Sequence, residues 1–231
     1  MIRLVCDPDQ RVGDALTLTP EQAHYLERVM RQKPGDVVEV QIKNEGVREA
    51  TVLGSGQLRL GRPTAARSEL PVRIMLYQAL LKQDHFAEVV ERGTEAGIAS
   101  FIPLVTSRAI VREVTSNREH RWRKIATEAT EQCRRAEVPR ILPVAHLKDL
   151  APPASGIGIL LDPGGVPLHA IVSGPIGEVG LVVGPEGGFT PDERNLLRTR
   201  GFQSVSLGPH VFRAENAGAF ATVMILALCA R

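Results

Sequence analysis

The sequence predicts an α/β protein in which a small β-barrel domain precedes a larger domain with a mostly parallel sheet and helices on both faces. Three observations carry this prediction. Apolar runs of strand length alternate with helical patterns from residue 73 onward, which is typical of parallel sheets. Short strands with polar glycine turns fill residues 37–60, as in small barrels. Residues 62–71 hold two prolines and alternating charges, so we expect a linker there.

The first domain, residues 1–70, should begin with a strand over Ile2–Cys6 and a helix. Thr19-Pro20-Glu21-Gln22 has the form of a capping box with proline at the first helical position, so a helix is expected to start there and run to Met30. Three β segments should then follow, separated by glycine-containing turns, at residues 37–43, 48–53 and 57–60.

In the second domain, residues 71–231, Asp84 can cap a helix that ends at Gly97. Ser116 and Glu119 form a further capping box for a helix that reaches about Ala136. Before, between and after these helices, the apolar runs predict strands at residues 73–80, 101–105, 141–144, 158–161 and 179–183.

Near the C-terminus, two strands each end in a glycine loop. The buried run 181–183 stops at Gly184, and a helix capped by Thr190 follows until Gly201. A second short strand, 205–207, stops at Gly208 before an Ala-rich final helix. Ligands bind beyond the carboxyl ends of parallel strands, where glycine admits close contact with the backbone. The loops therefore predict one ligand site; the alternative is that the glycines only form tight turns. They lack the Lys-Ser/Thr of a phosphate loop, which argues against a nucleoside triphosphate.

The charge distribution is uneven although the formal net charge is only +2. Residues 108–140 carry nine Arg or Lys and five Glu. Such a local excess of arginine suits a polyanion, because guanidinium groups bind phosphates in a bidentate way. The alternative is an ordinary solvated helix face.

Cysteine usage and hydropathy restrict the class of protein. Cys6, Cys133 and Cys229 are three widely spaced thiols, so neither a disulfide framework nor a zinc cluster is expected, and a reducing cytoplasm fits. No apolar run approaches the length of a membrane span, and no export signal is recognised. We therefore expect a cytoplasmic protein without a metal.

The C-terminal motifs resemble those of the SPOUT-superfamily enzymes that methylate N3 of a uridine in 16S ribosomal RNA. The pattern is G-P-E-G-G-F-[ST]-x-x-E, a helix ending in G-F, and L-G-x-x-[IVF]-[LF]-R-x-E-x-A. Asn216 departs from it, because this family usually has Thr there. The motif is carried by Gly184, Pro185, Glu186, Gly187, Gly188, Phe189, Glu193, Gly201, Phe202, Leu207, Gly208, Arg213, Glu215 and Ala217.

The resemblance implies a fold that periodicity could not predict. The second domain would be a SPOUT-type trefoil-knotted parallel-sheet domain whose knot forms the S-adenosylmethionine pocket. The segment H-x-L-x-R-V-x-R-x-x-x-G-D at residues 24–36 is similar to the family's PUA-like RNA-binding domain. The family also implies a homodimer and a 16S rRNA substrate within the small ribosomal subunit. The partner surface would be the apolar face of the last helix, Phe220, Val223, Met224, Leu226 and Ala227, unless that face is intramolecular core.

The resemblance also implies roles for individual residues. Glu95 and Arg135 match the family segments K-A-T-E-L-G and E-Q-x-x-R, with Arg92, Gly93 and Ala96 as departures from the first. The catalytic residues would be Glu95, Arg135, Arg213 and Glu215. The cofactor would be held by Leu161, Gly184, Pro185, Glu186, Gly188, Leu207, Gly208 and Phe212. RNA would be bound by Arg28, Arg31, Arg92, Arg108 and Arg134.

Several assignments stay open at this level. Arg92 and Arg135 can bind phosphate or uracil carbonyls, and Glu95 or Glu215 can accept or relay the N3 proton, but the same residues can form structural salt bridges. Cys133 and Trp122 are expected to be packing residues. The target can be another RNA or a ribose oxygen, as in other SPOUT enzymes, or the chain can be an RNA-binding assembly factor without activity.

Overall fold

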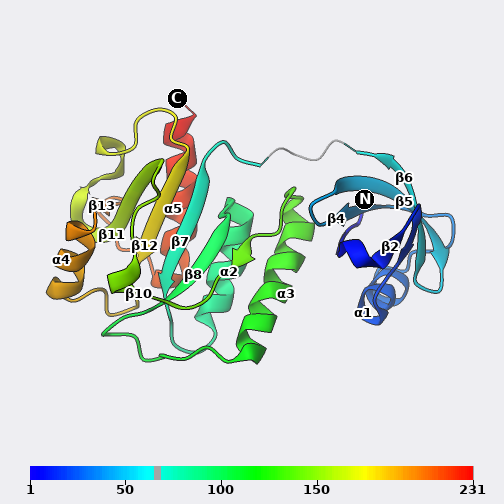
Figure 1. The fold of residues 1–231 in the computed structure, drawn as a ribbon, viewed down its shortest axis with the longest axis horizontal. Coiled ribbons are helices and arrows are strands. Elements are labelled where there is room, and N and C mark those ends of the chain that lie inside the picture. The colour runs from blue at the N-terminus through cyan, green and yellow to red at the C-terminus, as the bar shows by residue number, and fades with distance from the viewer. Residues whose placement is uncertain (65–68, 231) are drawn as a thin grey trace. The chain divides into compact units, whose positions relative to one another are not determined.

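The computed structural model describes residues 1–64 and 69–230, which form two compact units (Figure 1). The first unit comprises Met1–Glu69 together with Thr130–Val138, and the second comprises Leu70–Ala129 together with Pro139–Arg231. Of the linker expected at 62–71, residues 65–68 lie outside the described part of the chain.

The first unit is built on a six-stranded sheet in the order β1-β4-β5-β6-β3-β2. The strands expected from the sequence are confirmed as β1 (Arg3–Cys6), β4 (Val37–Ile42), β5 (Gly46–Gly54) and β6 (Gln57–Pro63). Two further strands, β2 (Arg11–Val12) and β3 (Ala15–Thr17), were not expected, because two or three residues are too few to show alternation. The core of this unit contains Leu4, Cys6, Leu16, Leu26, Val38, Val40, Ile42 and Leu58.

The capping box at Thr19 is confirmed. Thr19 Oγ1 accepts a hydrogen bond from the Gln22 N–H at 3.2 Å, and Gln22 Oε1 accepts one from the Thr19 N–H at 3.0 Å. The helix α1 (Pro20–His24) then widens into a π turn, η2 (Tyr25–Val29), rather than continuing as a regular α-helix to Met30. Arg31, at φ 56°, turns the chain away.

The second unit contains a sheet in the order β10-β8-β7-β12-β11-β13, with β9 beside β8. Each of its strand pairs is parallel, which confirms the prediction of a parallel sheet. The strands are β7 (Arg73–Ala79), β8 (Ser100–Val105), β9 (Arg140–Ile141), β10 (Ala145–His146), β11 (Gly156–Pro167), β12 (Glu178–Val183) and β13 (Phe202–Ser206).

One predicted strand is wrong in extent. The run 141–144 contributes only Ile141 to β9, and the Leu142 N–H makes one more bond, to the Phe101 carbonyl at 2.9 Å. Pro143 follows and has no N–H to donate, so the ladder stops there and resumes with β10.

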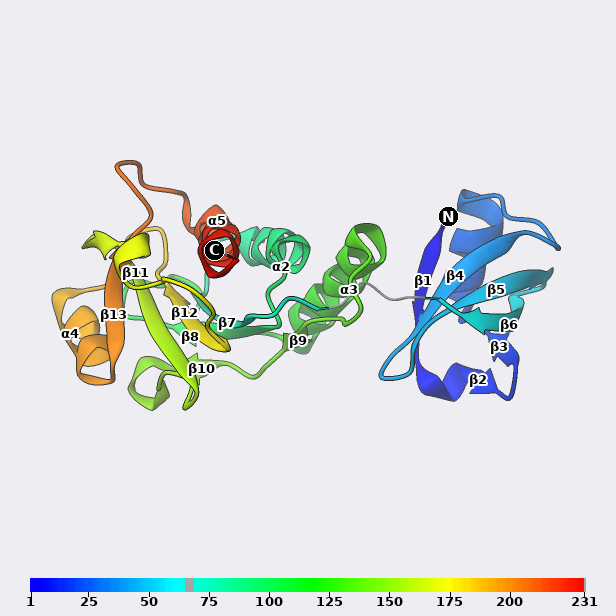
Figure 2. The same ribbon diagram turned by 90° about the horizontal axis from the view of Figure 1, so that it is seen from above.

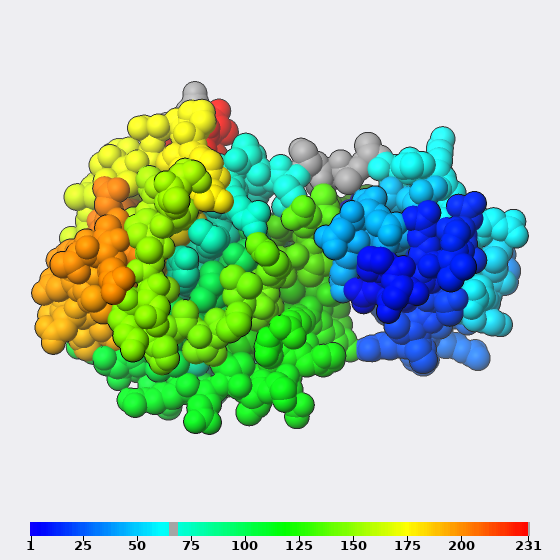
Figure 3. All heavy atoms as spheres, viewed as in Figure 1, coloured from blue at the N-terminus to red at the C-terminus, as the bar shows by residue number. Residues whose placement is uncertain are grey.

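Helices cover both faces of this sheet, as predicted (Figure 2). On one face, α5 (Ala214–Cys229) lies against β7 and β12 and beside α2 (His85–Ala96). Gly218 lies so close to Leu76 that an added Cβ would stand 2.8 Å from the leucine side chain. On the other face, Leu196 and Leu197 of α4 (Pro191–Thr199) join a core cluster with Leu160 and Val182. In Figure 3, α4 is the orange surface of this unit.

In the second unit, two predicted helix caps are wrong and one is confirmed. The helix α3 (Ser116–Cys133) is capped by Thr115, whose Oγ1 accepts from the Arg118 N–H at 3.3 Å, and not by Ser116. Asp84 stands at the start of α2 but makes no capping bond, because its ψ of 17° is not extended and its carboxylate pairs with Arg121. Thr190 caps α4 as expected, with its Oγ1 3.2 Å from the Glu193 N–H.

Trp122 confirms the expectation of a packing residue. Its ring is fully buried, and it packs on Phe86 with 4.2 Å between the ring centroids. Among the residues that the structure describes, no helix is long and apolar enough to cross a membrane.

Cys6 provides a test of the first unit's core. Its thiol is fully buried, and this burial, with the nearby carboxylate of Glu131, raises the pKa of Cys6 to about 12. Only the thiolate reacts with alkylating reagents. We therefore expect that iodoacetamide at pH 8 labels the half-buried Cys133 and Cys229 in the native protein, and labels Cys6 only in denaturant. Labelling of Cys6 in the folded protein at the rate of the other two thiols would contradict this packing.

Candidate functional site

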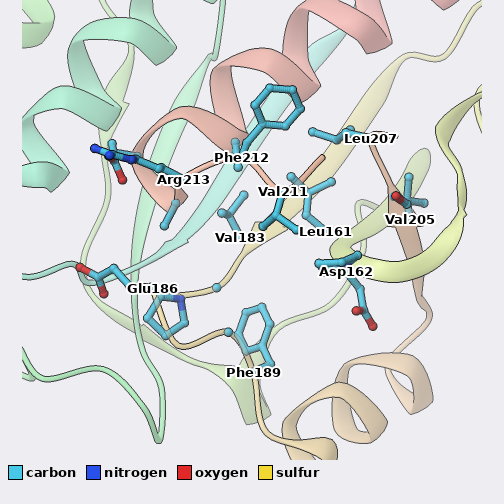
Figure 4. Close-up of a pocket in the computed structure, with 18 of the residues that line it drawn as sticks. Leu161, Asp162, Val183, Glu186, Phe189, Val205, Leu207, Val211, Phe212 and Arg213 are labelled. Carbon is cyan, nitrogen blue, oxygen red and sulfur yellow. The ribbon is translucent and has the colours of Figure 1, made fainter. Parts of the chain in front are cut away.

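A cavity of about 560 Å³ lies at the carboxyl ends of β12 and β13 and beside the irregular middle part of β11 (Figure 4). It is bordered by the segment that follows Leu161, by the loop from Gly184 to Phe189 and by the loop from Leu207 to Arg213. All of its lining residues belong to the second unit. This volume is typical of sites for small molecules and cofactors.

Glycine conformations shape the loop from Gly184 to Phe189. The Gly188 N–H bonds to the Pro185 carbonyl at 2.8 Å, and Gly188 has φ +65°, a conformation that other residues rarely adopt. An added Cβ on Gly184 would stand 3.1 Å from the ring of Phe189. The glycines therefore allow the loop to fold tightly over Phe189 and leave its backbone facing the cavity.

The walls of the cavity are mostly apolar. Figure 4 shows side chains from several strands and loops converging on the same space. Such walls suit a flat, weakly polar ring system, and the backbone groups of the loops can supply the few hydrogen bonds that orient it. The apolar residues are Leu161, Val183, Phe189, Val205, Leu207, Val211 and Phe212.

One rim of the cavity carries a cluster of opposite charges. The Asp162 carboxylate is 3.8 Å from Arg194 and 3.7 Å from Arg198, and it accepts a hydrogen bond from the Gly164 N–H at 3.2 Å. Arg194 also donates to the Phe189 carbonyl at 2.8 Å. Arg194 therefore connects two of the segments that border the cavity.

The first turn of α5 contributes Arg213 and Glu215. Glu215 is only 9% exposed and lines the cavity, and its carboxylate has no hydrogen-bond or ion-pair partner within the described part of the chain. A buried carboxylate without a partner is costly, so this position suits a ligand that brings a positive charge or a hydrogen-bond donor. Arg213 is exposed, and in Figure 4 it lies on the same side of the cavity as Glu186.

His85, which was not predicted from the sequence, lines the cavity from the first turn of α2. Its Nδ1 is 2.9 Å from Glu88 Oε1, and Glu88 Oε2 is 2.7 Å from Arg92. Arg92 Nη1 donates in turn to Asn216 Oδ1. The hydrogen bond from His85, together with the charge of Arg92, holds the pKa of Glu88 below its usual range. The i, i+3 spacing of His85 and Glu88 could have indicated the pair, but not its place at the cavity.

Most residues predicted to hold the cofactor line this cavity. Leu161, Gly184, Pro185, Glu186, Gly188, Leu207 and Phe212 do so, whereas Gly208 only adjoins Leu207.

The four predicted catalytic residues do not all meet there. Arg213 and Glu215 line the cavity, but Glu95 lies in a separate hollow of about 370 Å³, with Arg92, Asn216 and Phe220 among its other lining residues. Arg135 belongs to the first unit.

Several of the predicted RNA-binding arginines contact backbone carbonyls. Arg108 Nη1 donates to the Gly187 carbonyl at 2.6 Å, and Arg134 Nη2 donates to the Met1 carbonyl at 3.1 Å. Arg28 and Arg31 are exposed and have no partner among the described residues. The predicted RNA-binding arginines therefore include some with structural contacts and some with exposed charge that is unpaired among the described residues.

Arg135 has a clear structural partner in Glu69. Its Nη2 is 2.8 Å from Glu69 Oε2, and the other carboxylate oxygen accepts from the N–H groups of Ala136 and Glu137 at 3.1 and 3.0 Å. The Arg135 side chain is only 10% exposed. Glu69 thus secures the turn that follows α3 within the first unit.

We therefore expect Glu69→Gln and Arg135→Ala each to lower the free energy of unfolding by about 1–3 kcal/mol, because each leaves a largely buried charged group with fewer partners. Urea denaturation measures this change. Glu137→Gln is the matched control, since that side chain is exposed. Full stability of both variants would show that the Arg135–Glu69 pair has no structural role.

The side chains that the structure describes do not form a set of metal ligands. Across residues 1–64 and 69–230, no group of three or more His, Cys, Asp or Glu side chains is placed to hold a metal ion.

Comparison with known proteins adds independent findings. Residues 68–226 match the model of a family described as RNA methyltransferase domain. The chain is 34% identical to the ribosomal RNA small subunit methyltransferase E of Synechocystis sp., over 98% of this chain and 77% of the relative. It is 30% identical to the protein of the same name from Bacillus subtilis, over 92% of this chain and 90% of the relative.

Two solved structures are also similar to this chain over almost its whole length. A ribosomal RNA small subunit methyltransferase E from Neisseria gonorrhoeae, bound to S-adenosyl methionine, aligns with a TM-score of 0.89 at 26% identity, over 99% of this chain and 98% of that one. A structure from Legionella pneumophila that holds the cofactor SAM aligns with a TM-score of 0.88 at 27% identity, over 98% of this chain and 97% of that one.

Proposed function

The chain belongs to the ribosomal RNA small subunit methyltransferase E family of RNA methyltransferases, and from this premise we propose that it methylates N3 of a uridine in 16S rRNA. The methyl donor is S-adenosylmethionine. The observation that carries the proposal is the cavity at the ends of β12 and β13, which combines glycine loops, apolar walls and the unpartnered carboxylate of Glu215.

The cavity fits this donor in both chemistry and size. The apolar residues Leu161, Val183 and Leu207 would hold the adenine ring, and loop backbone groups at Gly184 and Gly188 would hydrogen bond to the polar edges of the molecule. The buried carboxylate of Glu215 would face its cationic part, which explains why that carboxylate has no protein partner.

When bound, S-adenosylmethionine supplies an electrophilic methyl group on a sulfonium centre. The protein must hold the acceptor base beside it, exclude water and take up the N3 proton. Arg213, exposed at the rim, is placed to hold a phosphate or a uracil carbonyl of the acceptor. Glu215 is the predicted catalytic carboxylate that lines the donor cavity, whereas Glu95 lines the other hollow.

We further propose that the first unit is a PUA-like RNA-binding domain. Its support is the exposed pair Arg28 and Arg31 at the π turn that ends the first helix, where neither guanidinium has a partner in the described residues. Unpaired surface arginines can bind RNA phosphates without first losing an intramolecular contact. The substrate would be 16S rRNA within the small ribosomal subunit, in the cytoplasm.

The trefoil knot and the homodimer are also proposals. The knot is supported by the two loops, 184–190 and 207–213, that border one cavity on either side of α4 and β13. The dimer is supported by α5, on which Phe220 and Val223 are 48% and 54% exposed. Met224, Leu226 and Ala227 are half-buried or exposed, while the residues that α5 buries are Ala217, Gly218, Ala221, Thr222 and Ile225.

The decisive experiment is methyl transfer from labelled S-adenosylmethionine to unmodified 16S rRNA, both naked and in assembled 30S subunits, followed by nucleoside analysis. We expect label in 3-methyluridine, with the assembled subunit as the better substrate. Label in another nucleoside, or in tRNA offered in parallel, would move the target and reject the N3 assignment. Donor binding without any transfer would reject this substrate, and absence of donor binding would favour an assembly factor.

Substitution of the two candidate carboxylates separates their roles. We expect Glu215→Gln to lower the rate of methyl transfer by about 10²-fold or more, because it removes a charge that faces the reacting groups. Glu95→Gln is the matched control and should change the rate by less than about threefold. Single-turnover kinetics and calorimetric donor titration distinguish chemistry from binding. A larger loss at Glu95 would place the acceptor in the hollow between α2 and α5 instead.

A further inference from the structure

His85 and Glu88 form a hydrogen-bonded pair at the edge of the proposed donor cavity. His85 is the first residue of α2 and lines the cavity, while Glu88 lies one turn later on the same helix. The His85 side chain is 36% exposed, so its ring meets both the cavity and solvent. His210 also lines the cavity, but it has no hydrogen-bond or ion-pair partner among the described residues.

The pair determines which nitrogen of His85 is free to react. Glu88 is held in its ionised form, because His85 and Arg92 both lower the pKa of its carboxyl group. A carboxylate only accepts hydrogen bonds, so His85 Nδ1, at 2.9 Å, must carry the proton. In the neutral imidazole this leaves the lone pair on Nε2. The carboxylate therefore selects the tautomer in which Nε2 can accept a proton.

The position of Glu88 is itself secured. Arg92 lies one further turn along α2 and binds both the other oxygen of Glu88, at 2.7 Å, and the side chain of Asn216 in the first turn of α5. The imidazole, the carboxylate and the guanidinium thus form a chain from the cavity to the helix that carries Glu215. Such support fixes the orientation of the ring.

We propose that His85 is a catalytic residue that accepts the N3 proton of the acceptor uridine through Nε2. This inference rests on the proposed function and specifies which group acts as the base. The bond from N3 to hydrogen breaks, and its proton goes to Nε2. The freed electron pair on N3 forms the new bond to the methyl carbon, while the pair of the broken carbon–sulfur bond stays on sulfur. The imidazolium then loses its proton to solvent, to which the ring is exposed.

The charges balance without a metal or a further reactant. One positive charge disappears from sulfur, and one appears on His85, where the Glu88 carboxylate stabilises it. His85 then takes the role of the base, while the carboxylate of Glu215 faces the donor.

Other charged groups share this environment and contribute to any pH dependence. On and before α2 they are Lys82, Asp84 with its partner Arg121, Glu88 and Arg92, and around the cavity they are Asp162, Glu186, Arg194, His210, Arg213 and Glu215.

The test compares His85→Gln and Glu88→Gln with His169→Gln, an exposed control outside the cavity. For His85→Gln we expect methyl transfer to fall about 10²-fold, the usual contribution of a general base, with donor affinity unchanged within about twofold. The wild-type rate should fall as the pH is lowered, because a protonated Nε2 cannot accept a second proton. His85→Gln should lose this acidic limb, and the control should retain both rate and limb.

Glu88→Gln gives a second, graded result. This substitution removes the carboxylate that fixes the tautomer of His85 and that stabilises the imidazolium, so the rate should fall by about tenfold. Nitrogen NMR of the histidine ring in the free protein provides a readout independent of activity: Nδ1 should be protonated and Nε2 unprotonated in the neutral form.

The outcomes separate this inference from the function on which it rests. A wild-type protein that forms no 3-methyluridine would reject both. Formation of 3-methyluridine by His85→Gln at the wild-type rate, with the acidic limb intact, would reject only the role of His85. The opposite tautomer in the NMR spectrum would reject it as well, whatever the activity.

Discussion

Parallel hydrogen bonding of β11 between β12 and β13 is the constraint on which the site depends. It aligns the carboxyl ends of β12 and β13 with the middle of β11, so that the loops after β12 and β13 border the same space as Leu161. A register shift within β11, between Leu161 and Val166, keeps the strand paired with β13 while Asp162 and Pro163 stay at the cavity. The cavity is therefore a consequence of sheet topology, and the glycines adapt the loops to it.

On one face of the sheet, α2 and α5 carry a chain of hydrogen-bonded polar side chains that begins at this cavity. Helix α5 packs directly on the sheet, where Gly218 permits close approach to Leu76. That approach brings the first turn of α5 beside α2, and Arg92 can then bind both Glu88 and Asn216. Asn216, which departs from the C-terminal motif, thus has a defined structural partner in Arg92. Close helix packing and the orientation of His85 are parts of the same arrangement.

Arginine has two distinct uses in this protein. Two arginines with predicted functional roles also have structural contacts: Arg108 binds the Gly187 carbonyl in the glycine loop, and Arg135 binds Glu69. Arg28 and Arg31 remain exposed without partners among the described residues. A count of positive charge along the chain cannot separate these uses, because a guanidinium has five donors and suits carbonyls, carboxylates and phosphates alike.

Local sequence determined most of the secondary structure, since hydrophobic periodicity and capping act over a few residues. Thr190 and Thr19 capped their helices as their motifs predicted, and the glycine loops followed β12 and β13. Motif similarity also indicated Arg213 and Glu215, and most of the residues that it predicted to hold the cofactor line the cavity. Ser116 was misassigned as a helix cap, because Thr115 accepts the capping hydrogen bond. Asp84 was misassigned because its carboxylate pairs with Arg121. Only the tertiary structure placed His85 at the cavity, Glu95 outside it and Arg135 against Glu69, because each placement depends on residues distant in the sequence that packing brings together.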